Sequence, residues 1–275
     1  MAGRLAGKVA IVTGSGSGIG RATAVAFAAE GASVVLAELV AERAERVAQT
    51  IRDAGGAAVV DDVDVTDGAR VEALVARTVE RFGAVDALVH SAANVPLVND
   101  HDARLTELEQ DVWDRIIGLF LTGTFHVCKH VGRQMLRQRS GSIVLVSTTD
   151  ALVGVAGLDA YTAAKGGVTA LTRSFAAGMA PDGVRVNAIC PSFVATEPQQ
   201  AWLANPESQE TVDLLHLLPI ASPEQIAPLA LYLASDESDV MTGTVLPIDS
   251  GYTAFKARLD VMGAMRVDAA EGPER

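Results

Sequence analysis

Short runs rich in valine, isoleucine and alanine alternate along this chain with longer stretches of helical period, and this alternation restricts the possible fold more than any other feature. Most of the runs are continuously apolar, which is typical of strands buried on both faces of a parallel sheet. The predicted strands are Lys8–Thr13, Ala32–Glu38, Ala57–Val63, Val85–Ser91, Gly141–Ser147, Val184–Cys190 and Thr244–Asp249. The predicted helices are Ile19–Glu30, Val40–Ala54, Gly68–Phe82, a long one near Glu107–Arg139, Ala160–Ala180 and Pro223–Ser235.

Strand–helix–strand alternation implies right-handed crossovers. We therefore expect an α/β fold, a single doubly wound (Rossmann) domain with a seven-stranded parallel sheet flanked by helices. The domain is expected to span residues 1–254, with a C-terminal extension at 255–275. Pro247 removes a backbone donor, which places the last strand at a sheet edge. Residues 194–218 have weak periodicity and are expected to form a substrate lid or binding loop.

The composition excludes several classes of function. The 275 residues include 34 acidic and 22 basic side chains, and the formal net charge of −12 disfavours nucleic acid and anionic lipid as partners. No apolar run approaches the ~20 residues that span a bilayer, and Met1–Lys8 lacks the features of a signal peptide, so we expect a cytoplasmic protein. Cys128 and Cys190 are expected to be buried small hydrophobes. His126 and His130 lie four residues apart without a third ligand at a known spacing, so no metal site is expected.

A glycine-rich turn joins the first predicted strand to the first predicted helix. It reads Thr13-Gly14-Ser15-Gly16-Ser17-Gly18-Ile19-Gly20. Glycines let backbone N–H groups approach a pyrophosphate, and the helix N-terminus adds a favourable dipole. The strict G-x-G-x-x-G spacing is not met, and an ordinary tight turn is the alternative. In this strand–turn–helix context we expect a dinucleotide to contact Gly14, Ser17, Gly18, Ile19 and Gly20.

Acidic residues follow the second and third predicted strands. Glu38 lies about 20 residues beyond the turn, where a carboxylate accepts hydrogen bonds from the adenosine ribose and repels a 2′-phosphate. Its neighbours in the sequence bring no positive charge, so NAD is favoured over NADP as the cofactor. Asp64 can accept a hydrogen bond from the adenine amino group. The alternatives are a solvated glutamate at a strand end and an acidic loop, because Asp61 and Asp62 precede Asp64.

Tyr161 and Lys165 lie four residues apart at the start of a predicted helix, so their side chains share one face. A free phenol has a pKa of about 10 and is a poor base at neutral pH, but a nearby ammonium favours the phenolate and lowers that pKa. Such a phenol can take a proton from an alcohol or give one to a ketone. The lysine can also bind the nicotinamide ribose. A tyrosine and a lysine at this spacing are common and mostly have a structural role. The pair indicates a catalytic site only because the glycine-rich turn is also present.

Together these motifs resemble the short-chain dehydrogenase/reductase family over residues 5–254. The resemblance rests on Thr13–Gly20, Tyr161 with Lys165, Asn187–Pro191 leading to Thr196, and Asp249–Gly251. It implies a nicotinamide cofactor, interconversion of alcohols and carbonyls, and a homo-oligomer, commonly a homotetramer. It also implies that Val194 and Thr196 contact the nicotinamide carboxamide. Further cofactor contacts are expected from Val65, His90, Ala92 and Pro191.

Two departures from the family pattern lie at strand ends. The family usually has a serine thirteen residues before the tyrosine, where this chain has Thr148. A threonine hydroxyl can still donate to a substrate oxygen, and Ser147 is the alternative in this role. The family's Asn-Asn-Ala-Gly appears as His90-Ser91-Ala92-Ala93. We expect position 90 to lie over the cofactor ribose through its backbone.

A third departure is Phe120, which stands where a family asparagine holds a water that relays protons to the lysine. A phenyl ring cannot hold a water. Either the relay runs through another polar group, such as Ser91, or proton exchange is slower. The hydride step itself needs only the cofactor, Tyr161, Lys165 and a hydroxyl that orients the substrate oxygen.

The sequence therefore predicts an NAD-dependent dehydrogenase that acts on a secondary alcohol or its ketone, in the oxidative direction. Tyr161 is the expected general acid/base, Thr148 orients the oxygen, and Lys165 tunes the tyrosine. A pocket formed by residues 94–102, 151–158 and 194–218 is rather apolar, which favours a cyclic or hydrophobic alcohol. One alternative is a 3-oxoacyl-thioester reductase, which usually requires NADPH and a basic docking patch. The other is a catalytically weakened NAD-binding sensor or scaffold, which the presence of Phe120 suggests.

Overall fold

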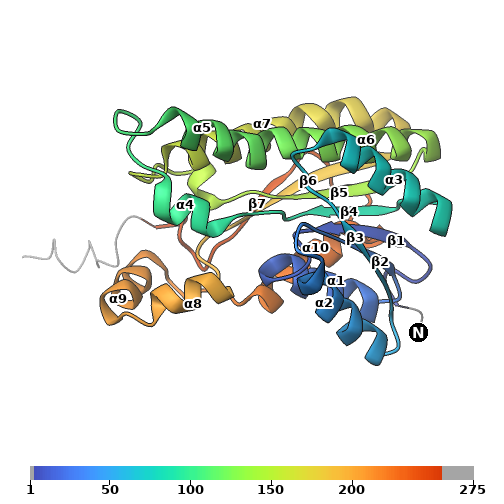
Figure 1. The fold of residues 1–275 in the computed structure, drawn as a ribbon, viewed down its shortest axis with the longest axis horizontal. Helices are drawn as coiled ribbons and strands as arrows, with labels where there is room; N and C mark the ends of the chain where they lie inside the picture. Colours follow the sequence, from blue (N-terminus) through green and yellow to red (C-terminus); the bar gives the residue numbers. More distant parts are fainter. Residues whose placement is uncertain (1–2, 256–275) are drawn as a thin grey trace, which may run out of the picture.

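Seven parallel strands form the central sheet of the computed structural model, which describes residues 3–255 (Figure 1). In spatial order they are β3 (Ala57–Asp62), β2 (Ser33–Glu38), β1 (Val9–Thr13), β4 (Ala87–His90), β5 (Gly141–Val146), β6 (Val184–Pro191) and β7 (Val245–Ile248). The predicted doubly wound sheet is confirmed, and β7, which contains Pro247, lies at its edge. The strand order reverses between β1 and β4, and open α/β sheets bind ligands outside the carboxyl ends of the strands at such a point.

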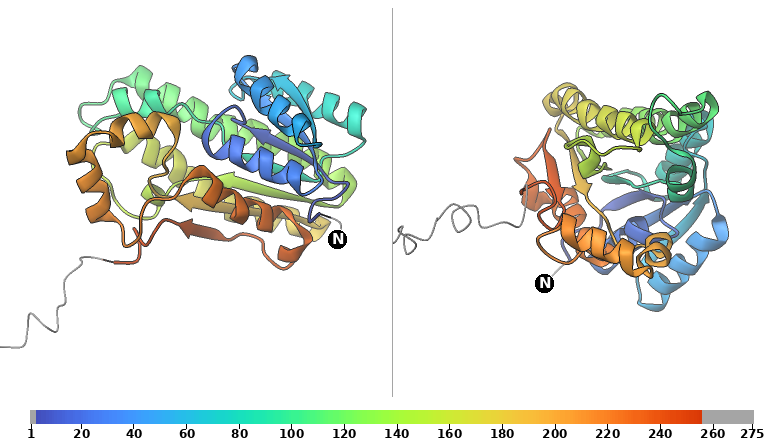
Figure 2. Two further views of the ribbon diagram at one scale, coloured as in Figure 1. Left: turned by 90° about the horizontal axis from the view of Figure 1, so that it is seen from below. Right: turned by 90° about the vertical axis from the view of Figure 1, so that its left-hand side faces the viewer.

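Helices cover both faces of the sheet (Figure 1). One face carries α1 (Gly18–Ala29), α2 (Ala41–Asp53) and α10 (Pro223–Ala234). The other carries α3 (Gly68–Phe82), α6 (Gly123–Gln138) and α7 (Asp159–Met179). Shorter helices follow the carboxyl ends of β4 and β6, and the left view of Figure 2 shows them at that end of the molecule. They are α4 (Val95–His101), α5 (Gln110–Ile117), α8 (Glu197–Leu203) and α9 (Pro206–Leu215).

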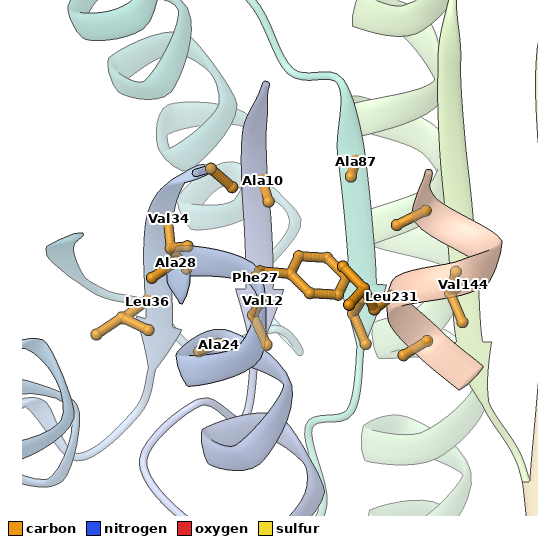
Figure 3. Packing of buried hydrophobic residues seen from close by; sticks show 14 of the residues in the cluster. Ala10, Val12, Ala24, Phe27, Ala28, Val34, Leu36, Ala87, Val144 and Leu231 are labelled. Carbon is orange, nitrogen blue, oxygen red and sulfur yellow. The ribbon is translucent and has the colours of Figure 1, made fainter. Parts of the chain in front are cut away.

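Apolar cores on the two faces of the sheet hold the helices against it. On one face Phe27 of α1 is fully buried and its ring points toward Leu231 of α10 (Figure 3). On the opposite face Met135 of α6 and Val168 of α7 pack beneath the middle strands. The continuous apolar runs are thus buried on both faces of the sheet, as the absence of alternating polar residues in these runs predicted. The sheet is a rigid frame for the residues at its carboxyl edge.

Several segments are more regular than their periodicity suggested. The predicted lid contains α8 and α9, and Asn205 caps α9 by accepting a hydrogen bond from Glu207 N at 3.0 Å. The predicted pocket segment 94–102 contains α4, which Asn94 caps in the same way. Both helices are short, so a pattern read over longer windows misses them.

The predicted long helix near Glu107–Arg139 is less regular than expected, because a π-helical turn, η1 (Gly118–Thr122), interrupts it.

Within residues 3–255, no helix has the length and apolar character needed to cross a membrane. Of the predicted C-terminal extension at 255–275, all residues after Phe255 lie outside the described residues.

Candidate active site

Tyr161 enters the site from the first turn of α7, and Asp102 holds that turn in place. The Asp102 carboxylate accepts hydrogen bonds from Ala160 N at 3.2 Å and from Tyr161 N at 2.9 Å. A carboxylate at a helix N-terminus satisfies free N–H groups and is favoured by the helix dipole. In the reverse direction, Leu105 N donates to Asp159 at 2.7 Å. The tyrosine therefore stands on a backbone that is tied to the segment after α4.

Lys165 lies one helical turn beyond the tyrosine and is only 6% exposed. Its ammonium donates a hydrogen bond to Val146 O, at the end of β5, over 2.7 Å. Nζ lies 5.0 Å from the ring centroid of Phe120 and 5.9 Å from that of Tyr161. Loss of hydration is the main cause that lowers the pKa of Lys165 to about 8. The sequence-predicted pair is thus brought together, with the ammonium held between a carbonyl and two aromatic rings.

Phe120 projects from the π-helical turn η1 and fills the space beside that pair. Its ring is 2% exposed and meets Tyr161 edge-on, with centroids 5.1 Å apart. Its backbone carbonyl accepts a hydrogen bond from Thr124 Oγ1 at 2.6 Å. Single π-helical turns are frequent at functional sites. Here the π-helical turn places the apolar ring of Phe120 against Lys165. The phenylalanine that replaces the family's asparagine is therefore well packed within the site.

Thr148 and Asp150 form the polar side of the site, just after β5. Thr148 Oγ1 donates to Asp150 Oδ2 at 3.1 Å and accepts from Asp150 N at 3.3 Å. The hydroxyl of Thr148 also favours the phenolate of Tyr161, which opposes the rise in the pKa of that phenol. Burial raises the pKa of Asp150, and the hydrogen bond from Thr148 opposes that shift. Asp150 was missed in the sequence, where its position two residues after the candidate hydroxyl was the available indication.

Ser147, the alternative hydroxyl, is turned away from this role. It is buried, and its Oγ donates to Lys165 O at 3.0 Å. Of the two candidates, Thr148 is the one whose hydroxyl influences the pKa of the tyrosine.

The pKa of Tyr161 is raised, whereas the sequence led us to expect that Lys165 lowers it. Burial is the largest cause, and the negative charge of Asp150 adds to it. The physical reason is the direction of the ammonium, which is bonded to the backbone and packed on Phe120. In the ligand-free chain the phenol therefore keeps its proton at neutral pH.

The glycine-rich turn lies at the carboxyl end of β1, and its glycines occupy places without room for a side chain. A Cβ on Gly14, whose φ is +64°, would lie 2.7 Å from Ser91 O. A Cβ on Gly20 would lie 2.1 Å from Gly14 O. Ser17 is the N-cap residue of α1, and Ile19 belongs to its first turn. The result is exposed backbone at a helix N-terminus, which suits a pyrophosphate.

Thr196 of the lid lies against this turn. A Cβ on Gly18 would lie 3.1 Å from Thr196 Cγ2. The lid is positioned by a β-bridge between Val194 and Ala221 and by the bond from Thr196 N to Val194 O at 2.7 Å. The buried Thr196 Oγ1 finds no hydrogen-bond partner within residues 3–255. An orphaned hydroxyl beside bare backbone fits a polar ligand such as a dinucleotide.

Glu38 reaches the same turn from the end of β2. Its carboxylate accepts from Gly16 N at 3.0 Å and from Val40 N at 3.2 Å. A side chain that sequence reasoning missed also lies here: a Cβ on Gly16 would be 2.6 Å from Arg43 Cβ. Arg43 belongs to α2, whose first turn folds back beside the glycines, so the adenosine end has a basic residue as well as an acidic one.

His90 ends β4 beside the switch point and ties it to β1. Thr13 Oγ1 accepts from Ser91 N at 3.1 Å and from Ala92 N at 3.2 Å, so its own proton is directed to His90 Nδ1, 2.8 Å away. Burial, with Lys165 adding, lowers the pKa of His90 to about 3. The ring is therefore a neutral structural link in place of the family's asparagine, and it holds Ala92 beside Gly14.

Three other predicted cofactor contacts are placed at strand ends. Asp64, after β3, accepts from Thr66 N at 2.9 Å and Thr66 Oγ1 at 2.7 Å, so one of its oxygens stabilises its own turn. Val65 is buried beside α6. Pro191 is the last residue of β6, from which the lid departs.

The two histidines at helical spacing diverge. His126 Nδ1 faces Val65 O at 3.3 Å, and His130 faces Glu72 at 4.0 Å. In the part of the chain that the structure describes, no cluster of three or more histidine, cysteine or acidic side chains could hold a metal ion. Both cysteines are buried and free, as predicted.

Comparisons with known proteins give the same outline. The sequence profile of a family described as enoyl-(acyl carrier protein) reductase matches residues 14–253. Cis-4-hydroxycyclohexanecarboxylate dehydrogenase of Sinomonas cyclohexanicum is 41% identical over 247 residues, 90% of this chain and 97% of the relative. A 3-oxoacyl-(acyl-carrier-protein) reductase of Thermotoga maritima is 35% identical over 248 residues, 90% of this chain and 98% of the relative. The solved structure of a short-chain type dehydrogenase/reductase from Mycobacterium ulcerans superposes with a TM-score of 0.86 at 27% identity, over 92% of each chain.

Proposed function

Because this chain belongs to the short-chain dehydrogenase/reductase family, we propose that it is an NAD-dependent enzyme that interconverts a secondary alcohol and its ketone by hydride transfer. The observation that carries this proposal is the gathering of Tyr161, Lys165 and Thr148 at the edge of the sheet that also holds the glycine-rich turn. When bound, the nicotinamide ring supplies the acceptor or donor of the hydride.

Residues around the strand ends would hold the dinucleotide. The backbone of Gly14–Gly20 would receive the pyrophosphate, and the Thr196 hydroxyl, which is otherwise unpaired in the described residues, would bond its nicotinamide end. Lys165 would bind the nicotinamide ribose. Glu38 would accept from the adenosine ribose hydroxyls, and its charge would repel a 2′-phosphate, which favours NAD. Arg43 acts in the opposite direction, so this preference needs a direct test.

The catalytic group in this proposal is Tyr161, which exchanges a proton with the substrate oxygen while Thr148 orients that oxygen. The hydroxyl of Thr148 is at present directed to Asp150, so its proton must turn toward a bound substrate. The substrate we propose is a cyclic or otherwise hydrophobic alcohol. Support comes from the lid, where Phe193 stacks on Trp202 with ring centroids 5.7 Å apart, and from the relative named for a hydroxycyclohexane carboxylate. The negative charge of Asp150 disfavours a substrate carboxylate placed next to it.

A 3-oxoacyl-thioester reductase is the second candidate. The Thermotoga maritima relative and the position of Arg43, which could meet a 2′-phosphate, favour it. Glu38 and the formal net charge of −12 disfavour both NADPH and an acidic carrier protein. The third candidate, a catalytically weakened NAD-binding sensor or scaffold, is supported by Phe120 alone.

The test is calorimetric binding of NAD and NADP, followed by turnover assays with cyclic alcohols, linear secondary alcohols and a 3-oxoacyl thioester. We expect tighter NAD binding and oxidation of a cyclic alcohol. Tyr161→Phe should bind NAD normally and lose about 10²-fold or more of the turnover rate. NADPH-dependent reduction of the thioester alone would replace this proposal by the second candidate. Binding of NAD without hydride transfer to any compound would favour the sensor.

We also propose that the chain acts as a cytoplasmic homo-oligomer, a tetramer by family resemblance. Phe125, on the outer side of α6, is 50% exposed, which is the kind of side chain that subunit contacts cover. Light scattering after size-exclusion chromatography should give about four times the 28.6 kDa chain mass. A monomer that retains full activity would contradict the assembly without affecting the proposed reaction.

A further inference from the structure

The lid (residues 194–218) is attached to the body of the protein through very few buried side chains. Between residues 195 and 218 only Val212 and His216 are buried, and both are 0% exposed. The two lie four residues apart, so they share one side of the C-terminal end of α9. Helix α8 has no buried side chain. Apart from the β-bridge between Val194 and Ala221 at its base, the lid is therefore anchored where α9 ends.

Hydrogen bonds engage both ring nitrogens of His216. Nδ1 lies 2.7 Å from Val212 O, which can only accept, so Nδ1 carries a hydrogen. Nε2 lies 3.0 Å from Ser192 Oγ, in the segment that leaves β6. A hydroxyl can donate or accept, so this second contact is kept in either charge state of the ring. The Ser192 hydroxyl also reaches Asp249 O at 3.1 Å, just after β7, so the imidazole links α9 to the ends of two strands.

The loop after β7 gives this link a fixed base. The Asp249 carboxylate accepts hydrogen bonds from Gly251 N at 3.0 Å and from Thr253 N at 2.8 Å, which holds the loop in one conformation. Ser250 O accepts from Leu217 N, at the end of the lid, at 2.9 Å. Water can replace each hydrogen bond between lid and loop when the lid moves away, so these bonds close the lid at a small net free energy. Such an attachment suits a segment that must close and reopen.

We propose that His216 is a positioning residue that fastens the closed lid over the nicotinamide end of the cofactor site. The inference rests on the proposed function. Its partner Ser192 stands four residues before Thr196, whose hydroxyl, unpaired within residues 3–255, is proposed to bond the nicotinamide end. Trp202 of α8 belongs to the same lid and to the proposed substrate wall. Breaking the contact between Nε2 and Ser192 Oγ frees both side chains from the bound molecules, and the cofactor can then leave.

The experiment breaks the contact between His216 and Ser192 from each side and keeps the packing around it. His216→Phe retains a ring between Phe193 and Tyr252, whose centroids lie 5.9 Å and 5.2 Å from that of the imidazole, but has no ring nitrogen. Ser192→Ala removes the other partner, whereas Ser192→Thr keeps the hydroxyl. Ser140→Ala is the control, at an exposed position just before β5 and so at the opposite edge of the sheet.

Stopped-flow fluorescence measures the release of NADH when excess NAD displaces it. His216→Phe and Ser192→Ala should each speed this release about tenfold and raise the KM for the alcohol by a similar factor, as the loss of one or two hydrogen bonds would. The rate of hydride transfer at saturation should stay within a few-fold of wild type, because the proposed catalytic groups are untouched. The double variant should release NADH little faster than His216→Phe alone, since both changes break one contact. Ser192→Thr and Ser140→Ala should match wild type.

Hydrogen exchange followed by mass spectrometry gives a readout without cofactor or turnover. Amides of α8 and α9 should exchange about tenfold faster in His216→Phe and Ser192→Ala than in wild type, while those of β1 and β4 keep their wild-type rates. Wild-type exchange of the lid in both variants, wild-type NADH release and KM, or additive effects in the double variant would each overturn the inference. If the wild-type protein binds no NADH or oxidises no alcohol, the proposed function fails by itself, and the exchange rates alone decide whether His216 fastens the lid.

Discussion

Replacing Lys165 by methionine should change the stability of the chain in a way that depends on pH. Burial lowers the pKa of Lys165 from 10.5 to about 8. Between these values the unfolded chain binds a proton that the folded chain has released, so the stability of wild type rises with pH there. Below about pH 8 the folded chain carries the full cost of a buried ammonium, about 3 kcal/mol at 1.36 kcal/mol per pKa unit. Methionine carries no such cost at any pH.

Urea denaturation of the cofactor-free wild type and Lys165→Met, at about pH 7 and about pH 9.5, measures this effect. The pH-independent consequences of the substitution cancel when the two pH values are compared. The free energy of unfolding of the variant minus that of wild type should decrease by about 2 kcal/mol between them. Lys129→Met, at an exposed position on α6, is the control and should show no such change. A difference for Lys165→Met that is constant or increases with pH would refute the assignment of a buried, weakened ammonium.

Three further substitutions test other parts of the site. Gly14→Ala should cost about 2 kcal/mol or more in urea denaturation, because a Cβ there meets Ser91 O at a φ of +64°; wild-type stability would show that the turn can relax. Glu38→Ala should weaken NAD binding by about 10–100-fold in calorimetry and NADP binding less; an equal loss for both would remove the argument for NAD. Phe120→Asn should raise the rate of alcohol oxidation, because a polar side chain beside Lys165 can hold a water where the phenyl ring now packs on the ammonium; an equal or slower rate and an unchanged pH profile in stopped-flow assays would show that position 120 has no part in proton exchange.

The sheet and the cofactor turn could be predicted because their physical causes are local. A strand buried on both faces is apolar along most of its length, and Val9–Val12 of β1, Val34–Ala37 of β2 and Ala87–Val89 of β4 carry that pattern. The glycines of the turn are required by the close approach of neighbouring backbone. The spacing of Tyr161 and Lys165 follows from the helical repeat. These features therefore needed no knowledge of distant contacts.

The remaining features depend on segments that meet only in the folded chain. Asp102 holds the backbone of Tyr161 from 59 positions away. Arg43 meets the glycine-rich turn because α2 folds back on α1. The Lys165 ammonium points toward Val146 O and Phe120, and the phenol of Tyr161 stays protonated. This effect on the tyrosine could not be predicted from the spacing of the two residues. Spacing along the chain contains none of this information.

The most direct test is a single-turnover measurement of reduced-cofactor absorbance, with wild type and Tyr161→Phe each saturated with NAD and mixed with cyclic secondary alcohols. We expect a burst of reduced cofactor with at least one alcohol, and a rate slower by about 10²-fold or more in the variant at unchanged NAD affinity. A phenylalanine variant that transfers hydride at the wild-type rate would show that the phenol beside Lys165 is not where the substrate loses its proton.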